Sequence, residues 1–230
     1  MGRRPARCPE QRTRLTPVSG GNASTLWYVD DVDPAVVLRD AANDRSGAHA
    51  LAATLHRGLD VSPLGEEPLS AATELGDGEI VVGCFPGVVV VRTAESLPPV
   101  PSSLVERWIR PTGARHTYLC SSSPVTSAGS WGAFAHWDGA RLERSFSATP
   151  VHIVEDVGLP QLWERPFWSG AHPARPRMDV LPDPQILPFD PGEFAEAALR
   201  SWLGRDLDTS PITVSRFAIH PAGQGPASTP

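Results

Sequence analysis

Short apolar runs that alternate with polar residues, or end in turn residues, recur along the chain and are typical of β-strands. Pro86-Gly87 separates one pair of runs and Asp138-Gly139 another, and both dipeptides favour tight turns. Consecutive strands joined by such turns pair antiparallel, which predicts a meander sheet. The predicted strands are Leu26–Asp30, Glu79–Cys84, Val88–Arg92, Arg115–Ser121, Trp131–Trp137, Arg141–Ser147 and Ile212–Ile219.

Other segments carry helix signals. Asp33-Pro34 and Asp190-Pro191 each place a side chain that accepts backbone N–H groups before a proline at the first helical position. Gly58 and Gly204 are typical of residues that follow a helix end. The predicted helices cover residues 34–42, 47–57, 102–109 and 191–203. The sequence therefore predicts an α+β fold with a mainly antiparallel (mixed) sheet flanked by helices.

Composition divides the chain into a body and two tails. Residues 1–22 and 221–230 are rich in Pro, Gly, Ser or Arg and are predicted to be disordered. Of the 230 residues, 40% are hydrophobic, which is enough for a substantial core. We expect one α+β domain over 23–220, with long proline-rich loops in its last third.

The types and balance of charged residues exclude several classes of function. The 20 basic residues are all arginine, so the chain cannot build a Schiff base, a phosphate-loop lysine or a Ser-Lys dyad. The formal net charge is −6, and the first 20 residues are basic, so the body is more acidic still. Such a body repels phosphate backbones, and nucleic acid is therefore not expected as a partner.

Neither a membrane segment nor a disulfide framework is predicted. The longest apolar run, Ile80–Val91, is shorter than the roughly 18 residues that cross a bilayer. Arg3-Arg4 is followed by prolines instead of the apolar stretch of an export signal. The odd number of cysteines, Cys8, Cys84 and Cys120, suits free thiols in a reducing compartment. These features predict a cytoplasmic protein.

Acidic residues follow the first predicted strand. Two carboxylates two residues apart at a strand end can bind Mg²⁺, and a class of phosphatases begins this way. Asp31 would be the nucleophile and Asp33 the acid/base, with Glu155 and Asp156 completing the metal site. The alternative, which we favour because helix caps are common, is that Asp33 caps a helix while Asp30 and Asp31 lie in solvent.

Weaker candidates lack the right context. Ser130, in Ala128–Gly132, resembles a nucleophile elbow, but a predicted strand follows it where an elbow needs a helix. One hypothesis pairs the thiol of Cys120 with the imidazole of His116 or His136. A second hypothesis places three histidines on one metal ion. Neither set has ligand spacing, so we expect core residues instead. The three histidines are His136, His152 and His172.

Large aromatic residues gather in the proline-rich region. Trp163, Trp168 and His172 are our candidate ligand-binding residues, because long irregular segments often form binding loops. The alternative is that the two tryptophans cover the sheet. We favour packing, since aromatics under long loops usually extend the core.

Four stretches, WYVDDVDP, SFSATPVHIVEDVG, FWSGAHP and LPFDPGEFAEAALRSWLG, resemble an uncharacterised family of actinobacterial proteins. The resemblance covers about residues 24–220. It implies a domain of unknown function with no established activity. Members open with a strand ending in Asp-Gly-Asp, to which Asp31 and Asp33 correspond, with Val32 at the glycine position.

Two function classes remain. The first is a non-catalytic binding or interaction module without a cofactor, whose partner is an unknown protein or small molecule. The alternative is a metal-assisted hydrolase that uses Mg²⁺ to act on a phosphorylated or polar small molecule. Because no complete catalytic constellation is visible in the sequence, we favour the binding module.

Overall fold

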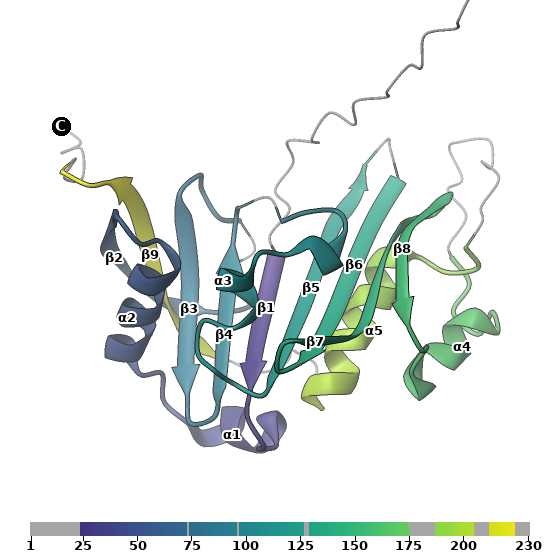
Figure 1. Cartoon of the computed structure of the whole chain (residues 1–230), viewed down its shortest axis with the longest axis horizontal. Helices are drawn as coiled ribbons and strands as arrows, with labels where there is room; N and C mark the ends of the chain where they lie inside the picture. The colour runs from purple at the N-terminus through teal and green to yellow at the C-terminus, as the bar shows by residue number, and fades with distance from the viewer. Residues whose placement is uncertain are drawn as a thin grey trace, which may run out of the picture.

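The computed structural model describes residues 24–72, 74–95, 97–126, 129–174, 187–204 and 212–223. These residues form a nine-stranded sheet in the order β2-β9-β3-β4-β1-β5-β6-β7-β8 (Figure 1), and each pair of neighbours is antiparallel. The strands are β1 (Ser24–Val29), β2 (Leu59–Pro68), β3 (Glu79–Phe85), β4 (Val88–Thr93), β5 (His116–Thr126), β6 (Gly129–Asp138), β7 (Arg141–Thr149), β8 (His152–Gly158) and β9 (Thr213–Pro221).

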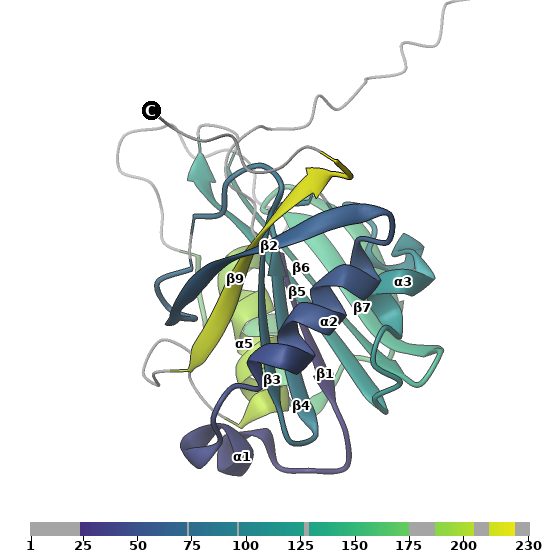
Figure 2. The same cartoon turned by 90° about the vertical axis from the view of Figure 1, so that its left-hand side faces the viewer.

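Helices cover both faces of this sheet. The helix α2 lies on one face with α3, and α5 crosses the opposite face (Figures 1 and 2). The α+β prediction is therefore confirmed. The helices are α1 (Pro34–Asp40), α2 (Arg45–Leu55), α3 (Glu106–Ile109), α4 (Arg165–Trp168) and α5 (Pro191–Leu203), with the 3₁₀ turns η1 (Pro101–Ser103) and η2 (Leu162–Glu164).

The central strand β1 is buried on both faces, which explains its uninterrupted apolar sequence. Leu26 and Tyr28 point into the core beneath α2 and α3. Trp27 and Val29 point into the core beneath α5. Each such side chain contributes roughly 1.5–3 kcal/mol by leaving water. The sheet is thus the shared wall of two cores.

The position of α5 depends on one close approach to the sheet. Asp190 caps this helix by accepting from the N–H groups of Gly192 and Glu193, and Gly204 ends it with a φ of 65°. A Cβ atom at Gly132 would lie 1.9 Å from the carbonyl oxygen of Pro191. Only glycine therefore allows β6 to pass under the first turn of the helix.

The structure also contains two strands that the sequence did not predict, β2 and β8. Both lie at edges of the sheet, where prolines and polar residues are tolerated, so their alternation is weak. The helix predicted over 102–109 is divided into η1 and α3, and α2 begins at Arg45 instead of residue 47. The predicted tail 1–22 lies outside the described residues, as does 224–230, whereas β9 extends to Pro221.

Candidate functional site

The acidic residues after β1 make different contacts. Asp33 caps α1, because its Oδ1 accepts from the N–H of Ala35 at 2.9 Å and of Val36 at 3.4 Å. Asp31 is exposed and accepts from Nη1 of Arg115 at 2.6 Å. The cap interpretation of Asp33 is therefore confirmed, and Asp31 has an arginine partner.

Glu155 and Asp156 lie in β8, at the far edge of the sheet. Three strands separate β8 from β1, so four inter-strand spacings of about 4.8 Å put the strands about 19 Å apart. Asp31 and Glu155 also lie toward opposite ends of the sheet, because the register carries Glu155 through Ser147 to the level of Ser24.

This separation excludes the metal site that the sequence suggested. One Mg²⁺ holds its ligands at about 2.1 Å, so Asp31 and Asp33 cannot share an ion with Glu155 and Asp156. Within the described ranges, no group of three or more His, Cys, Asp or Glu side chains is placed to hold a metal ion. The four acids are therefore not one site.

Asp156 belongs instead to a network around the buried Arg144. Glu164 accepts from Nε and Nη2 of this guanidinium, both at 2.8 Å, and Asp156 accepts from Nη1 at 2.6 Å. The carbonyl oxygens of Ser145 and Val157 also accept from Nη1. Burial by itself would lower the pKa of Arg144, but the hydrogen bonds to Glu164 and Asp156 outweigh it and raise the pKa. The guanidinium is fully buried, so a ligand from solvent does not reach it.

Glu155 is also bound within the protein. Its carboxylate accepts from the hydroxyl of Ser145 and from the hydroxyl and N–H of Ser102 in η1. The residue is 8% exposed. Glu155 therefore links β8 to η1, and its carboxylate is occupied by contacts within the protein.

The candidate aromatic residues lie near one another around α4. Trp163 packs against the core beneath α5 and donates to Oε1 of Gln161 at 2.8 Å. His172 stacks on Phe167 with ring centroids 4.1 Å apart. Trp168 donates to Oε2 of Glu164 at 3.4 Å and is partly exposed. These contacts support packing for Trp163. Trp168 also packs against Phe189 and Phe194 but is 37% exposed, and His172 is exposed.

The weaker candidates have structural partners. Ser130 is buried in β6, not at a turn into a helix, and donates to Oδ2 of Asp190. Cys120 donates to the carbonyl oxygen of Ala195, and burial raises the pKa of its thiol to about 12. Nε2 of His136 lies 3.3 Å from Nδ1 of His116, and burial together with His116 lowers the pKa of His136 to about 4. Neither the elbow nor a thiolate nucleophile is formed.

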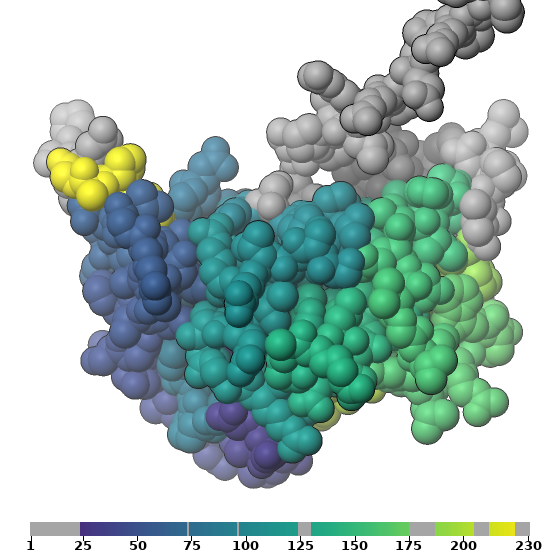
Figure 3. Space-filling view, in the orientation of Figure 1, coloured from purple at the N-terminus to yellow at the C-terminus, as the bar shows by residue number. Residues whose placement is uncertain are grey.

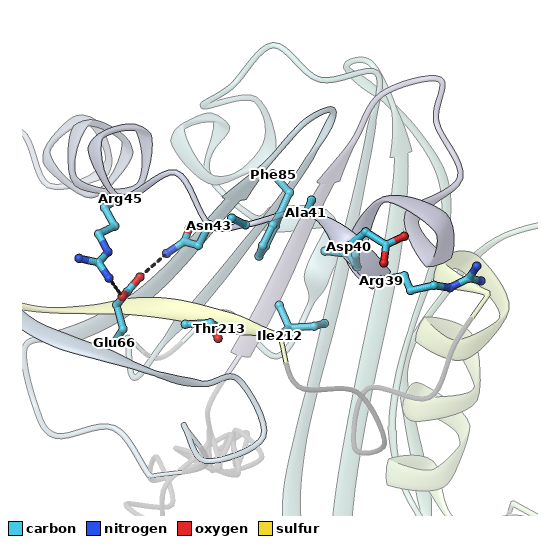
Figure 4. A pocket seen from close by; sticks show the side chains of 11 residues that line it. Arg39, Asp40, Ala41, Asn43, Arg45, Glu66, Phe85, Ile212 and Thr213 are labelled. Carbon is cyan, nitrogen blue, oxygen red and sulfur yellow. Dashed lines mark hydrogen bonds and ion pairs between the residues drawn. The ribbon is translucent and has the colours of Figure 1, made fainter.

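A different place in the molecule is hollowed. One hollow of about 370 Å³ lies between the α1–α2 connection and the ends of β2 and β9 (Figure 4). A second, of about 540 Å³, lies between α2 and the same two strands. Arg45 and Glu66 line both hollows. We call the two together the Arg45 groove.

Asn43 fixes the floor of the Arg45 groove. Its Oδ1 accepts from the N–H of Cys84 in β3 at 2.9 Å, and its Nδ2 donates to Oγ of Ser215 in β9 at 2.9 Å. The next residue, Asp44, donates its N–H to the carbonyl oxygen of Cys84 and caps α2. The start of α2 is thereby held against the sheet, and Arg45 projects from its first turn.

Two pairs of opposite charges line the groove. Arg45 and Glu66 form an ion pair at one end, and Arg39 and Asp40 lie at the other, with Phe85 between them (Figure 4). The Arg45 side chain is 76% exposed, and that of Glu66 is 25% exposed. The groove is therefore electrically balanced and accessible. Sequence reasoning missed it because its residues come from α1, α2, β2 and β9.

A family model described as a family of unknown function (DUF6928) matches residues 23–220. The chain belongs to this family. The match includes every residue of the Arg45 groove and agrees with the resemblance predicted over 24–220. A search of the curated proteins and a search of the solved structures each gave no match.

The structure of this DUF6928 member was also searched for helices that could cross a membrane. Among the described residues, no helix has both the length and the apolar character needed to cross a membrane.

Proposed function

We propose that the protein is a non-catalytic binding protein whose Arg45 groove holds a small polar molecule carrying both an anionic and a cationic group. One observation carries the proposal: the Arg45–Glu66 ion pair lines both hollows, so one ligand can reach both charges. Free amino acids have this chemistry and are the simplest example. The volumes of about 370 and 540 Å³ lie within the range of small-molecule pockets, about 300–1,000 Å³.

The balance of charges favours a ligand with both signs. A simple anion gains contact with Arg45 but meets Glu66 nearby and Asp40 at the other end of the hollow. A simple cation gains contact with Glu66 but meets Arg45 nearby. A molecule with both groups satisfies an arginine and an acid together, which is how complementary charges produce specificity.

The ion pair is suited to exchange with such a ligand. Exposed pairs contribute only about 0–1 kcal/mol to folding, so separating Arg45 from Glu66 costs little. Arg45 can then bind a carboxylate through two parallel N–H groups. Asn43 also donates to Oε1 of Glu66 at 3.4 Å, but its bonds to Cys84 and Ser215 hold it in place when the pair separates.

The lining supports binding without chemistry. The Ser215 hydroxyl accepts from Asn43, and Nε2 of His49 faces the carbonyl oxygen of Val61 at 3.3 Å. A nucleophile needs a hydroxyl or thiol in contact with a base, and these contacts direct both side chains elsewhere. A cytoplasmic location is part of the proposal, supported by the free thiols of Cys84 and Cys120.

Thermal unfolding with each of the free α-amino acids tests the proposal. A ligand at 100 times its dissociation constant adds about 2.7 kcal/mol. For a chain of this size, the midpoint should rise by roughly 5–10 °C. At least one amino acid should produce this rise, whereas acetate and methylammonium, which carry one charge each, should produce much less.

Matched variants locate the binding. Arg45→Ala should abolish the rise, and Arg107→Ala should keep it, because Arg107 forms a comparable exposed ion pair with Glu95 on another surface. An equal rise in both variants would place the ligand elsewhere. The absence of a rise with every amino acid would contradict the proposed ligand class.

A further inference from the structure

The second hollow of the Arg45 groove, of about 540 Å³, is lined differently from the first. All of its lining residues belong to α2, β2 or β9. Figure 3 shows α2 and β2 as the blue surface at the left-hand end of the molecule. Among the described residues, the Arg45–Glu66 pair supplies all the Asp, Glu and Arg side chains of this hollow. The other lining residues are Ser46, His49, Pro63, Gly65, Ser215 and Phe217.

Carbon surface from three elements lines the second hollow. Phe217 in β9 is 2% exposed, and its ring contacts the ring of His49 edge to face, with centroids 5.7 Å apart. His49 belongs to α2 and Pro63 to the neighbouring strand β2, and both residues are exposed. An apolar group that enters this hollow therefore leaves water and gains contact with rings.

Two of the uncharged polar side chains in the second hollow are already bound within the protein. Nε2 of His49 lies 3.3 Å from the carbonyl oxygen of Val61, and the hydroxyl of Ser215 accepts from Nδ2 of Asn43 at 2.9 Å. The third, Ser46, is exposed to water. A polar ligand group that loses water here gains few new hydrogen bonds, and its burial is therefore unfavourable.

A β-bulge in β2 shapes the second hollow. Pro63 pairs with Phe217 and Gly65 with Arg216, so Leu64 is the extra residue of the bulge. Bulges are frequent beside binding sites because they redirect the strand. A Cβ atom at Gly65 would meet no other atom within 4 Å. The space beside the bulge is therefore open.

We propose that the second hollow holds the side chain of an apolar amino acid, branched or aromatic, whose charged α-groups bind at the Arg45–Glu66 pair. This inference rests on the proposed function and names the class of amino acid. Arg45 and Glu66 line the second hollow themselves, so one molecule can meet both charges and place its side chain against His49 and Phe217. An aromatic side chain gains further ring contacts there.

The first hollow suits a different kind of side chain. Arg39 and Asp40 line it and do not line the second hollow. A ligand with a charged side chain would find an opposite charge in the first hollow, whereas an apolar side chain would approach two charged groups. The two placements therefore predict different preferred amino acids.

Isothermal titration calorimetry of the full chain with single amino acids tests the inference. Each buried methylene increases affinity about fourfold. Leucine has three more carbons than alanine, and an open hollow buries about half of their surface, so leucine should bind roughly tenfold more tightly. Phenylalanine should bind at least as tightly as leucine. Aspartate and arginine should bind no more tightly than alanine.

Matched variants locate the side chain of the ligand. His49→Ala removes part of the apolar lining, so the leucine-to-alanine affinity ratio should fall from roughly ten to about three. The fold should be kept, because the residue is exposed and alanine favours a helix. His152→Ala should keep the wild-type ratio, since His152 is exposed on β8 at the other edge of the sheet. A general change in stability does not alter such a ratio.

The results distinguish this inference from the proposed function. If no amino acid binds, both fail. If amino acids bind and Arg45→Ala abolishes binding, the proposed function stands, but the inference is overturned when alanine binds as tightly as leucine, or when aspartate or arginine binds most tightly. A ratio in His49→Ala equal to that of the wild type would overturn it as well.

Discussion

Removal of the charge on Glu164 should strongly destabilise the protein. Glu164 and Arg144 are both fully buried, and the carboxylate accepts from Nε and Nη2 at 2.8 Å. It also accepts from the N–H of Gln161 at 3.0 Å and from Nε1 of Trp168 at 3.4 Å. Glu164→Gln keeps the shape of the side chain but leaves the guanidinium with Asp156 as its ionic partner.

The expected loss follows from the buried cation. Breaking a buried pair by removing one partner costs about 3–5 kcal/mol, because a charge remains without compensation. Asp156 still offsets part of the charge, so we expect a loss near the lower end, about 3 kcal/mol. Removing both charges in Arg144→Met/Glu164→Leu should restore much of that stability, because apolar replacements of such pairs are often neutral.

Urea unfolding with linear extrapolation measures these free energies for the wild type and the variants. A loss below about 1 kcal/mol for Glu164→Gln would refute the reasoning, since that is the value of a surface pair. A double variant less stable than Glu164→Gln would also refute it. That result would mean that the attraction between Arg144 and Glu164 stabilises the fold by more than the loss of Glu164 alone destabilises it.

Three other outcomes follow from single residues. The pKa of His136 is lowered to about 4 by burial and by His116, so the unfolded chain binds more protons below its ordinary value of 6.5. Stability should therefore fall as the pH drops from about 6.5 to 4, and urea unfolding of His136→Phe should show a smaller fall. Asp33→Ala should cost about 1 kcal/mol in the same assay through loss of the α1 cap. Asp31→Ala should change stability by less than about 0.5 kcal/mol, and a larger effect would contradict its surface role.

Elements with local signals could be predicted from the sequence. Pro86-Gly87 and Asp138-Gly139 mark hairpins, and the φ of Gly87 is 73°, as a type II turn requires. The signals for the helix caps at Asp33 and Asp190 are also local in the sequence. Each signal is complete within a few residues, so no knowledge of the tertiary fold was needed.

The edge strands and the groove could not be predicted in this way. Pro63 and Pro68 conceal β2, because prolines are tolerated there only at a sheet edge. The groove depends on contacts such as Asn43 to Ser215, which are 172 residues apart. The distance between Asp31 and Glu155 depends on strand order, which short motifs do not specify.

The central claim is that the Arg45 groove binds a small molecule with both charges. The most direct test is an amide proton–nitrogen correlation spectrum recorded during a titration with the free amino acids. We expect the largest shifts at Asn43, Arg45, Glu66 and Ser215, with saturation at one ligand per chain. Shifts that concentrate elsewhere, for example at Asp31 and Arg115, or the absence of saturable shifts, would contradict the account.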